Sequence, residues 1–244
     1  ASLEHFVQLG LEWAFKAVEE IMAQFNGNDP KWSWVVNLSY GQPAGPKDGT
    51  RDLEKAIDKA IEHSKRPMRV IMPVGNSNLD RGHAEVVLDS DTRMLPLRIP
   101  PQDQTPTIIE IWSDPVEATH GPPKIGIVAP GEDKSTAVVT SPNWENADGE
   151  IDGGDIGLIF FRTVPVGGSS NLVRYRYVIA LRPTESQMPG VNLPVPGLWQ
   201  IALQWPNGGH VCADVQVDLA PSPGNSTGRV AYFDDPAYQR YDDN

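Results

Sequence analysis

The chain of 244 residues has little of several features that mark common protein classes. It has a single cysteine, Cys212, which excludes a disulfide within the chain and a zinc site built from several cysteines. It has no run of roughly 18 apolar residues, so the sequence predicts no membrane-spanning helix. Its 32 acidic residues outnumber 20 basic ones, and the net charge of −12 repels phosphate backbones and anionic lipid. We therefore expect neither nucleic acid nor a membrane as a partner.

The start of the sequence lacks a methionine and the basic and apolar regions of a secretion signal. It opens directly into a helical pattern at Ala1–His5. We interpret the chain as an internal piece of a larger catalytic unit, which we expect to be unable to catalyse a reaction alone.

The first part of the chain, residues 1–79, shows helical spacing and short apolar runs. Apolar residues recur every three or four positions over Val7–Phe25, and Ser2 can cap that helix. A second helix is expected over Asp52–Glu62, with Thr50 as its cap.

Two apolar runs, Trp34–Ser39 and Met68–Val74, flank the second helix and predict strands. A strand, a helix and a strand in this order form a parallel crossover unit, and apolar strands are typical of a sheet covered by helices. Such pairs occur in larger sheets, so the fold class expected for this part is a partial α/β core. An exposed edge of that sheet would favour self-association.

After residue 80 the pattern changes to short alternating runs separated by turns rich in proline and glycine. This pattern is typical of an all-β sandwich or jelly roll, which we assign to residues 80–228. Residues 229–244 are polar and aromatic and are expected to form a tail or linker. The predicted strands are Ala84–Leu88, Thr107–Trp112, Lys124–Val128, Thr136–Thr140, Gly157–Thr163, Leu172–Leu181, Leu198–Trp205 and His210–Leu219.

The candidate ligand site lies where the two predicted parallel strands end, because ligands of open α/β sheets collect at the carboxyl ends of the strands. Ser39, Tyr40 and Gly41 follow the first strand, and Gly75 and Asn76 follow the second. The glycines would let the backbone approach a ligand closely, and Asn76 would offer an amide donor. Two ordinary turns would have the same composition.

Four blocks of the sequence, taken in order, resemble subtilisin-like serine peptidases. In that family a helix with a G-I-E-W-A-like sequence leads to a V-I-N-M-S-L-G-like strand, followed by an amphipathic helix and a strand that ends in A-G-N. The resemblance covers roughly residues 8–78. Its blocks are Gly10–Ala14 (GLEWA), Val35–Gly41 (VVNLSYG), the helix Asp52–Glu62, and Val70–Ser77 (VIMPVGNS).

The resemblance implies part of a serine endopeptidase with a peptide or protein substrate, no cofactor, and a secreted or periplasmic location. Ser39, Tyr40, Gly41 and Gly75 would line the substrate channel, with backbone groups that pair with an extended peptide. Asn76 would donate a hydrogen bond to the oxyanion of the tetrahedral intermediate. The β-sandwich would be an insertion that follows this asparagine.

The catalytic motifs of the same family are missing from the sequence. It has no D-T/S-G-like strand end, no H-G-T-H-like segment and no G-T-S-M-A-like helix start. Without a nucleophile and a base, an oxyanion donor cannot support acyl transfer at a useful rate, so we expect the chain to be inactive alone. The alternative is a non-catalytic β-sandwich that binds a partner.

Three other groups of residues match weaker patterns. Gly224–Gly228 has the form G-x-S-x-G, but the prolines before it favour a loop over a nucleophile turn. The acidic cluster Asp148–Asp155 has spacing that calcium could use, and a solvated turn is favoured for it. Cys212 is interpreted as a small buried residue and His83 as merely exposed, and the scattered histidines indicate no zinc site.

Overall fold

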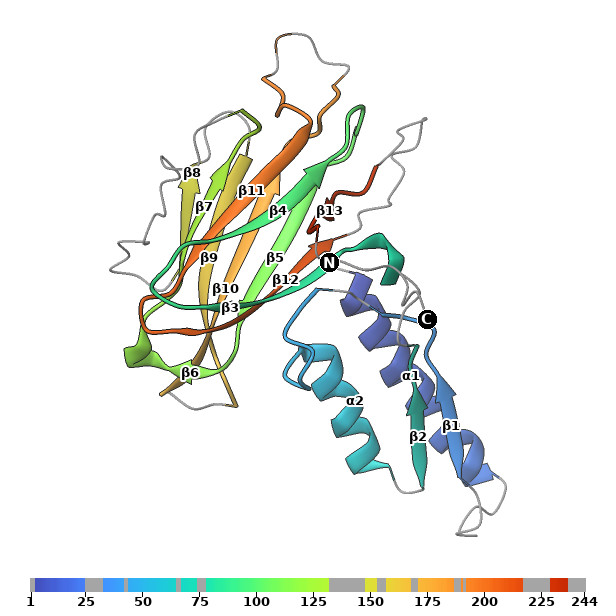
Figure 1. Ribbon diagram of the computed structural model, residues 1–244. Helices are drawn as coiled ribbons and strands as arrows, with labels where there is room; N and C mark the ends of the chain where they lie inside the picture. Colours follow the sequence, from blue (N-terminus) through green and yellow to red (C-terminus); the bar gives the residue numbers. More distant parts are fainter. Residues whose placement is uncertain are drawn as a thin grey trace, which may run out of the picture. The chain divides into compact units, whose positions relative to one another are not determined.

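The computed structural model describes residues 3–24, 33–41, 44–64, 67–73, 78–131, 148–152, 157–167, 171–186, 190, 192–216 and 229–236. Within these residues the chain forms two α-helices and three β-sheets (Figure 1). It divides into two compact units: a helical unit, Ala1–Gln42 and Lys47–Gly75, and a β unit, Pro43–Pro46 and Asn76–Asn244. Neither of the described helices combines the length and the apolar character needed to cross a membrane.

The helical unit is held together by a small apolar core. Buried Leu11 of the first helix meets buried Leu53 and Ile57 of the second, and Val36 and Val70 of the two strands pack against them. Both helices therefore cover the same face of the strand pair. The elements of this unit are α1 (Leu3–Gln24), β1 (Trp34–Asn37), α2 (Asp52–His63) and β2 (Met68–Ile71).

The strands of the helical unit are parallel, and both are shorter than the sequence predicts. Their register runs from Trp34 opposite Met68 to Asn37 opposite Ile71. β2 ends before Pro73, which has no backbone N–H to continue the ladder.

The expected cap of α2, Thr50, lies one residue too early. The cap position is held by Arg51, whose backbone N–H donates to Glu54 Oε2 at 3.0 Å. The Thr50 hydroxyl instead donates to Asp48 Oδ1 at 2.6 Å, within the preceding turn. A carboxylate that reaches back from the third helical position satisfies the same end of the helix as a capping hydroxyl would.

The β unit contains two antiparallel sheets among its described residues. The larger has the strand order β3-β12-β5-β10-β9-β8, with β6 paired to β10, and the smaller has the order β13-β4-β11-β7. Two short 3₁₀ helices, η1 (Asn78–Asp80) and η2 (Ala118–His120), lie between strands. The strands are β3 (His83–Leu88), β4 (Arg93–Ile99), β5 (Thr107–Ser113), β6 (Val116–Glu117), β7 (Lys124–Val128), β8 (Asp148–Asp152), β9 (Gly157–Pro165), β10 (Leu172–Leu181), β11 (Gly197–Gln204), β12 (Gly209–Gln216) and β13 (Tyr232–Phe233).

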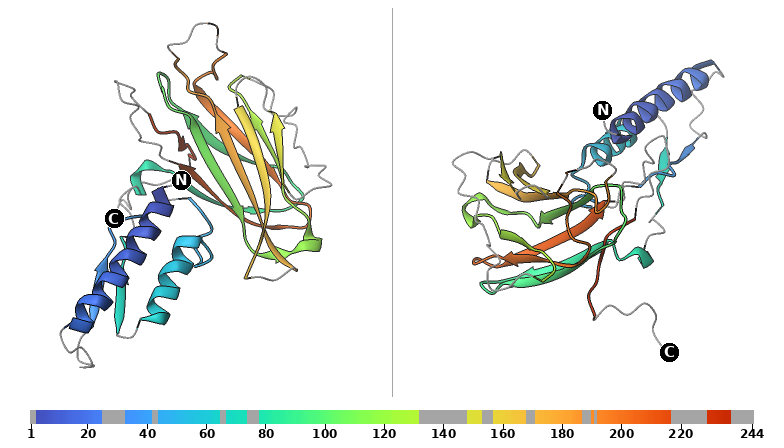
Figure 2. Two further views of the ribbon diagram at one scale, coloured as in Figure 1. Left: turned by 180° about the vertical axis from the view of Figure 1, so that it is seen from behind. Right: turned by 90° about the horizontal axis from the view of Figure 1, so that it is seen from above.

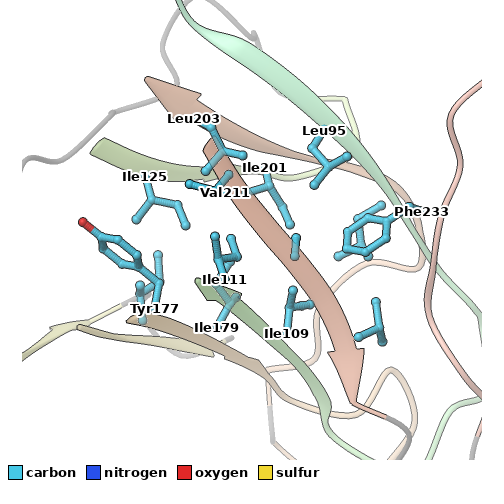
Figure 3. Packing of buried hydrophobic residues seen from close by; sticks show 14 of the residues in the cluster. Leu95, Ile109, Ile111, Ile125, Tyr177, Ile179, Ile201, Leu203, Val211 and Phe233 are labelled. Atoms are coloured by element: carbon cyan, nitrogen blue, oxygen red, sulfur yellow. The ribbon is translucent and has the colours of Figure 1, made fainter. Parts of the chain in front are cut away.

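One hydrophobic core is shared by the two sheets, which form two layers (Figure 2). Ile109, Ile111 and Ile179 of the larger sheet face Ile201 and Leu203 of the smaller one (Figure 3). Burial of alternate residues along a strand is what an antiparallel sheet requires when only one of its faces meets a core.

The observed strands include several that the sequence patterns miss. The sequence did not predict β4, because it contains Pro96 and a proline within an apolar run argues against a paired strand. Pro96 lies within β4, one position past the last residue that pairs with β13. Its carbonyl accepts a hydrogen bond from the Asp234 N–H at 2.9 Å. The expected turn at Asp148–Asp155 is also wrong in part, because Asp148–Asp152 is strand β8, paired with β9. The predicted strand Thr136–Thr140 and the segment Gly224–Gly228 lie outside the described residues.

The expected tail does not begin at Arg229, because residues 229–236 are anchored in the β unit. Phe233 is buried, with 3% of its surface exposed, in the shared core. Asp234 accepts from Arg98 Nη2 at 2.6 Å, and this bond raises the pKa of Arg98. Buried Asp103 accepts the backbone N–H of Arg229 at 3.0 Å. These contacts pack residues 229–236 against the β unit, whereas a tail would be exposed to solvent.

The anchoring of this segment predicts a large effect of Phe233→Ala. Removing a fully buried phenylalanine should lower the free energy of unfolding by about 3–5 kcal/mol, measured by urea denaturation. Val195→Ala is a control in the same unit, because Val195 is 58% exposed, and it should change the free energy by less than about 0.5 kcal/mol. Equal effects of the two substitutions would show that residues 229–236 do not belong to the core.

Candidate functional site

The parallel register of β1 and β2 brings their carboxyl ends to one edge of the strand pair. The ladder ends with the Leu38 N–H, which donates to the Ile71 carbonyl at 2.9 Å. Ser39, Tyr40 and Gly41 leave from this edge, and the chain leaves β2 at the same edge toward Gly75 and Asn76. The structure describes the first three of these predicted site residues, whereas Gly75 and Asn76 lie outside the described residues.

The three described residues of the strand end differ in their surroundings. Ser39 and Gly41 are exposed, while Tyr40 is half-buried and packs against the apolar core of the helical unit. The Tyr40 N–H donates to the Leu38 carbonyl at 2.8 Å, so the chain turns as it leaves the strand. Tyr40 anchors the segment, and the residues on either side of it are presented to solvent.

Gly41 is not required by the packing of the chain itself. A Cβ built on it would meet no atom within 4 Å, and its φ is not in the left-handed region. Among the described residues, no protein group approaches Gly41 closely enough to require a glycine.

The face of the strand pair that the helices do not cover carries apolar side chains. Val35 is 60% exposed and Ile71 56%. Singly exposed apolar residues are common, but two on one face of a two-stranded sheet resemble the face of a larger, covered sheet. A separate groove between α1 and α2, lined in part by Leu11, Phe15 and Trp34, contains none of the predicted site residues.

The structure also gathers polar side chains that the sequence patterns kept apart. His83 and Glu85 of β3 lie beside His210 and Cys212 of β12, with Cys212 directly opposite Glu85. The ligand atoms of His83, Glu85 and Cys212 all lie within 4.8 Å of one another. Cys212 is half-exposed rather than buried, and His83 is 42% exposed.

His83 is more than an exposed histidine. Its Nδ1 lies 2.7 Å from Oδ1 of Asp214, whose side chain is only 1% exposed. The signal in the sequence was the spacing of two, H-x-E and H-x-C, within two alternating strands. Such pairs share one face of a sheet, but only the strand pairing brings the two pairs together.

The open space at Gly41 leads to a prediction for Gly41→Ala. Because the added methyl group meets none of the described residues, the free energy of unfolding should change by less than about 0.5 kcal/mol in urea denaturation. Gly209→Ala is the contrasting variant, since its Cβ would collide with the ring of buried Trp205, and it should cost about 1–3 kcal/mol. A clear loss of stability with Gly41→Ala would mean that the fold itself requires this glycine.

Comparison with known proteins gives a likeness in structure only. No protein-family model and no curated protein matches the sequence. Among solved structures, the chain is similar to that of the Clostridium perfringens CspB protease, with a TM-score of 0.62 and 17% sequence identity. The likeness covers 88% of this chain and 40% of that one, so the chain spans less than half the length of the protease. At this identity the likeness shows that the two chains share a fold.

Proposed function

We propose that this chain is part of a subtilisin-like serine endopeptidase, to which it contributes a substrate-binding strand end and an oxyanion donor. The observation that carries the proposal is the parallel pairing of β1 with β2. It brings the carboxyl ends of both strands, which in the sequence precede Ser39–Gly41 and Gly75–Asn76, to the same edge. The sequence resemblance assigns the two halves of a peptide-binding site to these segments, and the fold shared with a protease supports this assignment.

The strand end has the properties that an extended peptide needs. The exposed backbone around Ser39 and Gly41 lies beyond the last ladder bond, and a peptide can add there as a further strand. Held in this way, the scissile carbonyl would lie near Asn76, whose side-chain amide would donate to the oxygen as negative charge develops. The chain would thus bind the substrate and stabilise the transition state, while the nucleophile and base come from elsewhere in a longer protein.

We further propose that the β unit is a β-sandwich of the jelly-roll type, inserted in the sequence of the peptidase core. Residues near the start of the unit and in its last described segment are joined, because the Phe233 N–H donates to the Arg81 carbonyl at 2.9 Å. The Arg81 side chain lies 3.4 Å from the Asp234 carboxylate and stacks over the Tyr232 ring at 5.7 Å. Adjacent ends are what allow a folded unit to be inserted into a host domain.

The remaining sheet strands and the catalytic triad would come from the host. The exposed apolar face at Val35 and Ile71 would be covered there by further elements. In the isolated chain the same face and the edge of the strand pair would favour self-association.

The isolated chain should not hydrolyse peptides. Because its sequence holds none of the three catalytic motifs, we expect no cleavage of a casein or anilide substrate above a buffer blank, and no labelling by a serine-directed fluorophosphonate. Intact-mass spectrometry after the reaction is the measurement. Stoichiometric labelling of any serine, Ser226 included, would contradict the account.

The longer protein provides the positive test. Its gene should encode D-x-G-like and H-G-T-H-like segments before this chain and a G-T-S-like segment after it. In that protein, Asn76→Ala should lower kcat by about 10²–10³, the loss known for this donor in subtilisin, with little change in KM. Asn78→Ala is the control and should leave kcat unchanged. Flanking sequence without these segments would instead support the alternative of a non-catalytic binding module.

A further inference from the structure

The outer face of the larger sheet carries a cluster of side chains that can bind a metal ion. β3 and β12 pair antiparallel at the edge of this sheet, with Cys212 opposite Glu85 and Asp214 opposite His83. Alternate residues point to the same face, so His83 and Glu85 of one strand lie beside His210 and Cys212 of the other. Two imidazoles, a carboxylate and a thiol are thus collected within one sheet edge of the β unit.

The distances within the cluster are close to those of a small tetrahedral site, and some of them are longer. His83 Nε2 lies 3.4 Å from Glu85 Oε1, and His210 Nε2 lies 4.0 Å from Glu85 Oε2. The ligand atoms of His83, Glu85 and Cys212 all lie within 4.8 Å of one another. A tetrahedral ion with bonds of about 2.0–2.3 Å holds its ligand atoms roughly 3.3–3.8 Å apart. Small side-chain rotations on a fixed sheet would suffice to reach that geometry.

Both histidines are oriented as metal ligands are. His83 Nδ1 lies 2.7 Å from the buried Asp214 carboxylate, and His210 Nδ1 lies 3.3 Å from Asp114 Oδ2. In each case Nδ1 can donate to the carboxylate behind the ring, and Nε2 is the nitrogen that faces Glu85. A metal ion bound at this position would replace the proton on Nε2 and leave Nδ1–H donating to the carboxylate. A carboxylate behind each imidazole fixes the tautomer and the ring orientation in many metal sites.

We propose that His83, Glu85 and Cys212, with His210 as the fourth ligand, form a zinc site on the outer face of this sheet. A thiolate with imidazole ligands selects zinc over magnesium and calcium, which prefer oxygen ligands. The ion would join the edge strand β3 to its neighbour β12. The proposal uses residues of the β unit only and does not depend on the proposed peptidase function.

The test is titration of the 244-residue chain with cobalt(II), a spectroscopic substitute for zinc. We expect the chain to bind one cobalt ion and to show a thiolate-to-cobalt charge-transfer band in the near ultraviolet. Added zinc should displace the cobalt and remove the band. Cys212→Ser should lose the band, and His83→Gln and Glu85→Gln should weaken binding at least about tenfold. His63→Gln and Glu117→Gln are the matched controls from outside the cluster and should bind as the wild type does.

A second measurement needs no variant, because Cys212 is the only thiol in the sequence. Saturating zinc should slow the alkylation of Cys212 by iodoacetamide at least about tenfold, since a metal-bound thiolate is a poorer nucleophile. An unchanged alkylation rate would overturn the proposal. So would uptake well below one ion per chain, or a charge-transfer band that survives Cys212→Ser. Any of these results would identify the cluster as a hydrogen-bonded network only.

Discussion

The arrangement of the β unit depends on the register of β12 with its two neighbours. Val211, Ala213 and Val215 are buried on the inner face, and this alternation sends His210, Cys212 and Asp214 to the outer face. A slip of one residue would exchange the two sets and force a thiol, an imidazole and a carboxylate into an apolar core. The hydrophobic effect on one side of the strand therefore determines which polar groups meet on the other.

The same strand shows what sequence patterns can and cannot predict. Alternation predicted its position within a few residues, and the runs that became β5, β7 and β10 were equally clear. It failed for β4, where proline interrupts the run, and for β13, which is too short to show a period. It also failed for residues 229–236, because one buried aromatic residue, Phe233, and the ion pairs of Asp234 with Arg81 and Arg98 leave no periodic trace.

The two candidate sites differ in how much of each could be predicted from local sequence. The strand end at Ser39–Gly41 was found because a contiguous block carries it, and its neighbour Asn76 belongs to another such block. The cluster around Glu85 was missed because its members come from strands more than a hundred positions apart in the sequence. Only the pairing of β3 with β12 relates them, and no local period encodes that pairing. Cys212 was misplaced for a related reason, since alternation does not say which of two faces is inside.

The bond between Phe233 and Arg81 has a consequence for the energetics of a host protein. A disordered loop of roughly 150 residues closed between two host positions would cost about 4 kcal/mol in chain entropy. If the β unit is inserted as proposed, it would avoid that cost, because its folding already holds Arg81 and Phe233 together. Gaining or losing the whole unit would then change the loop-closure entropy at the insertion point about as much as changing the length of a short surface turn would.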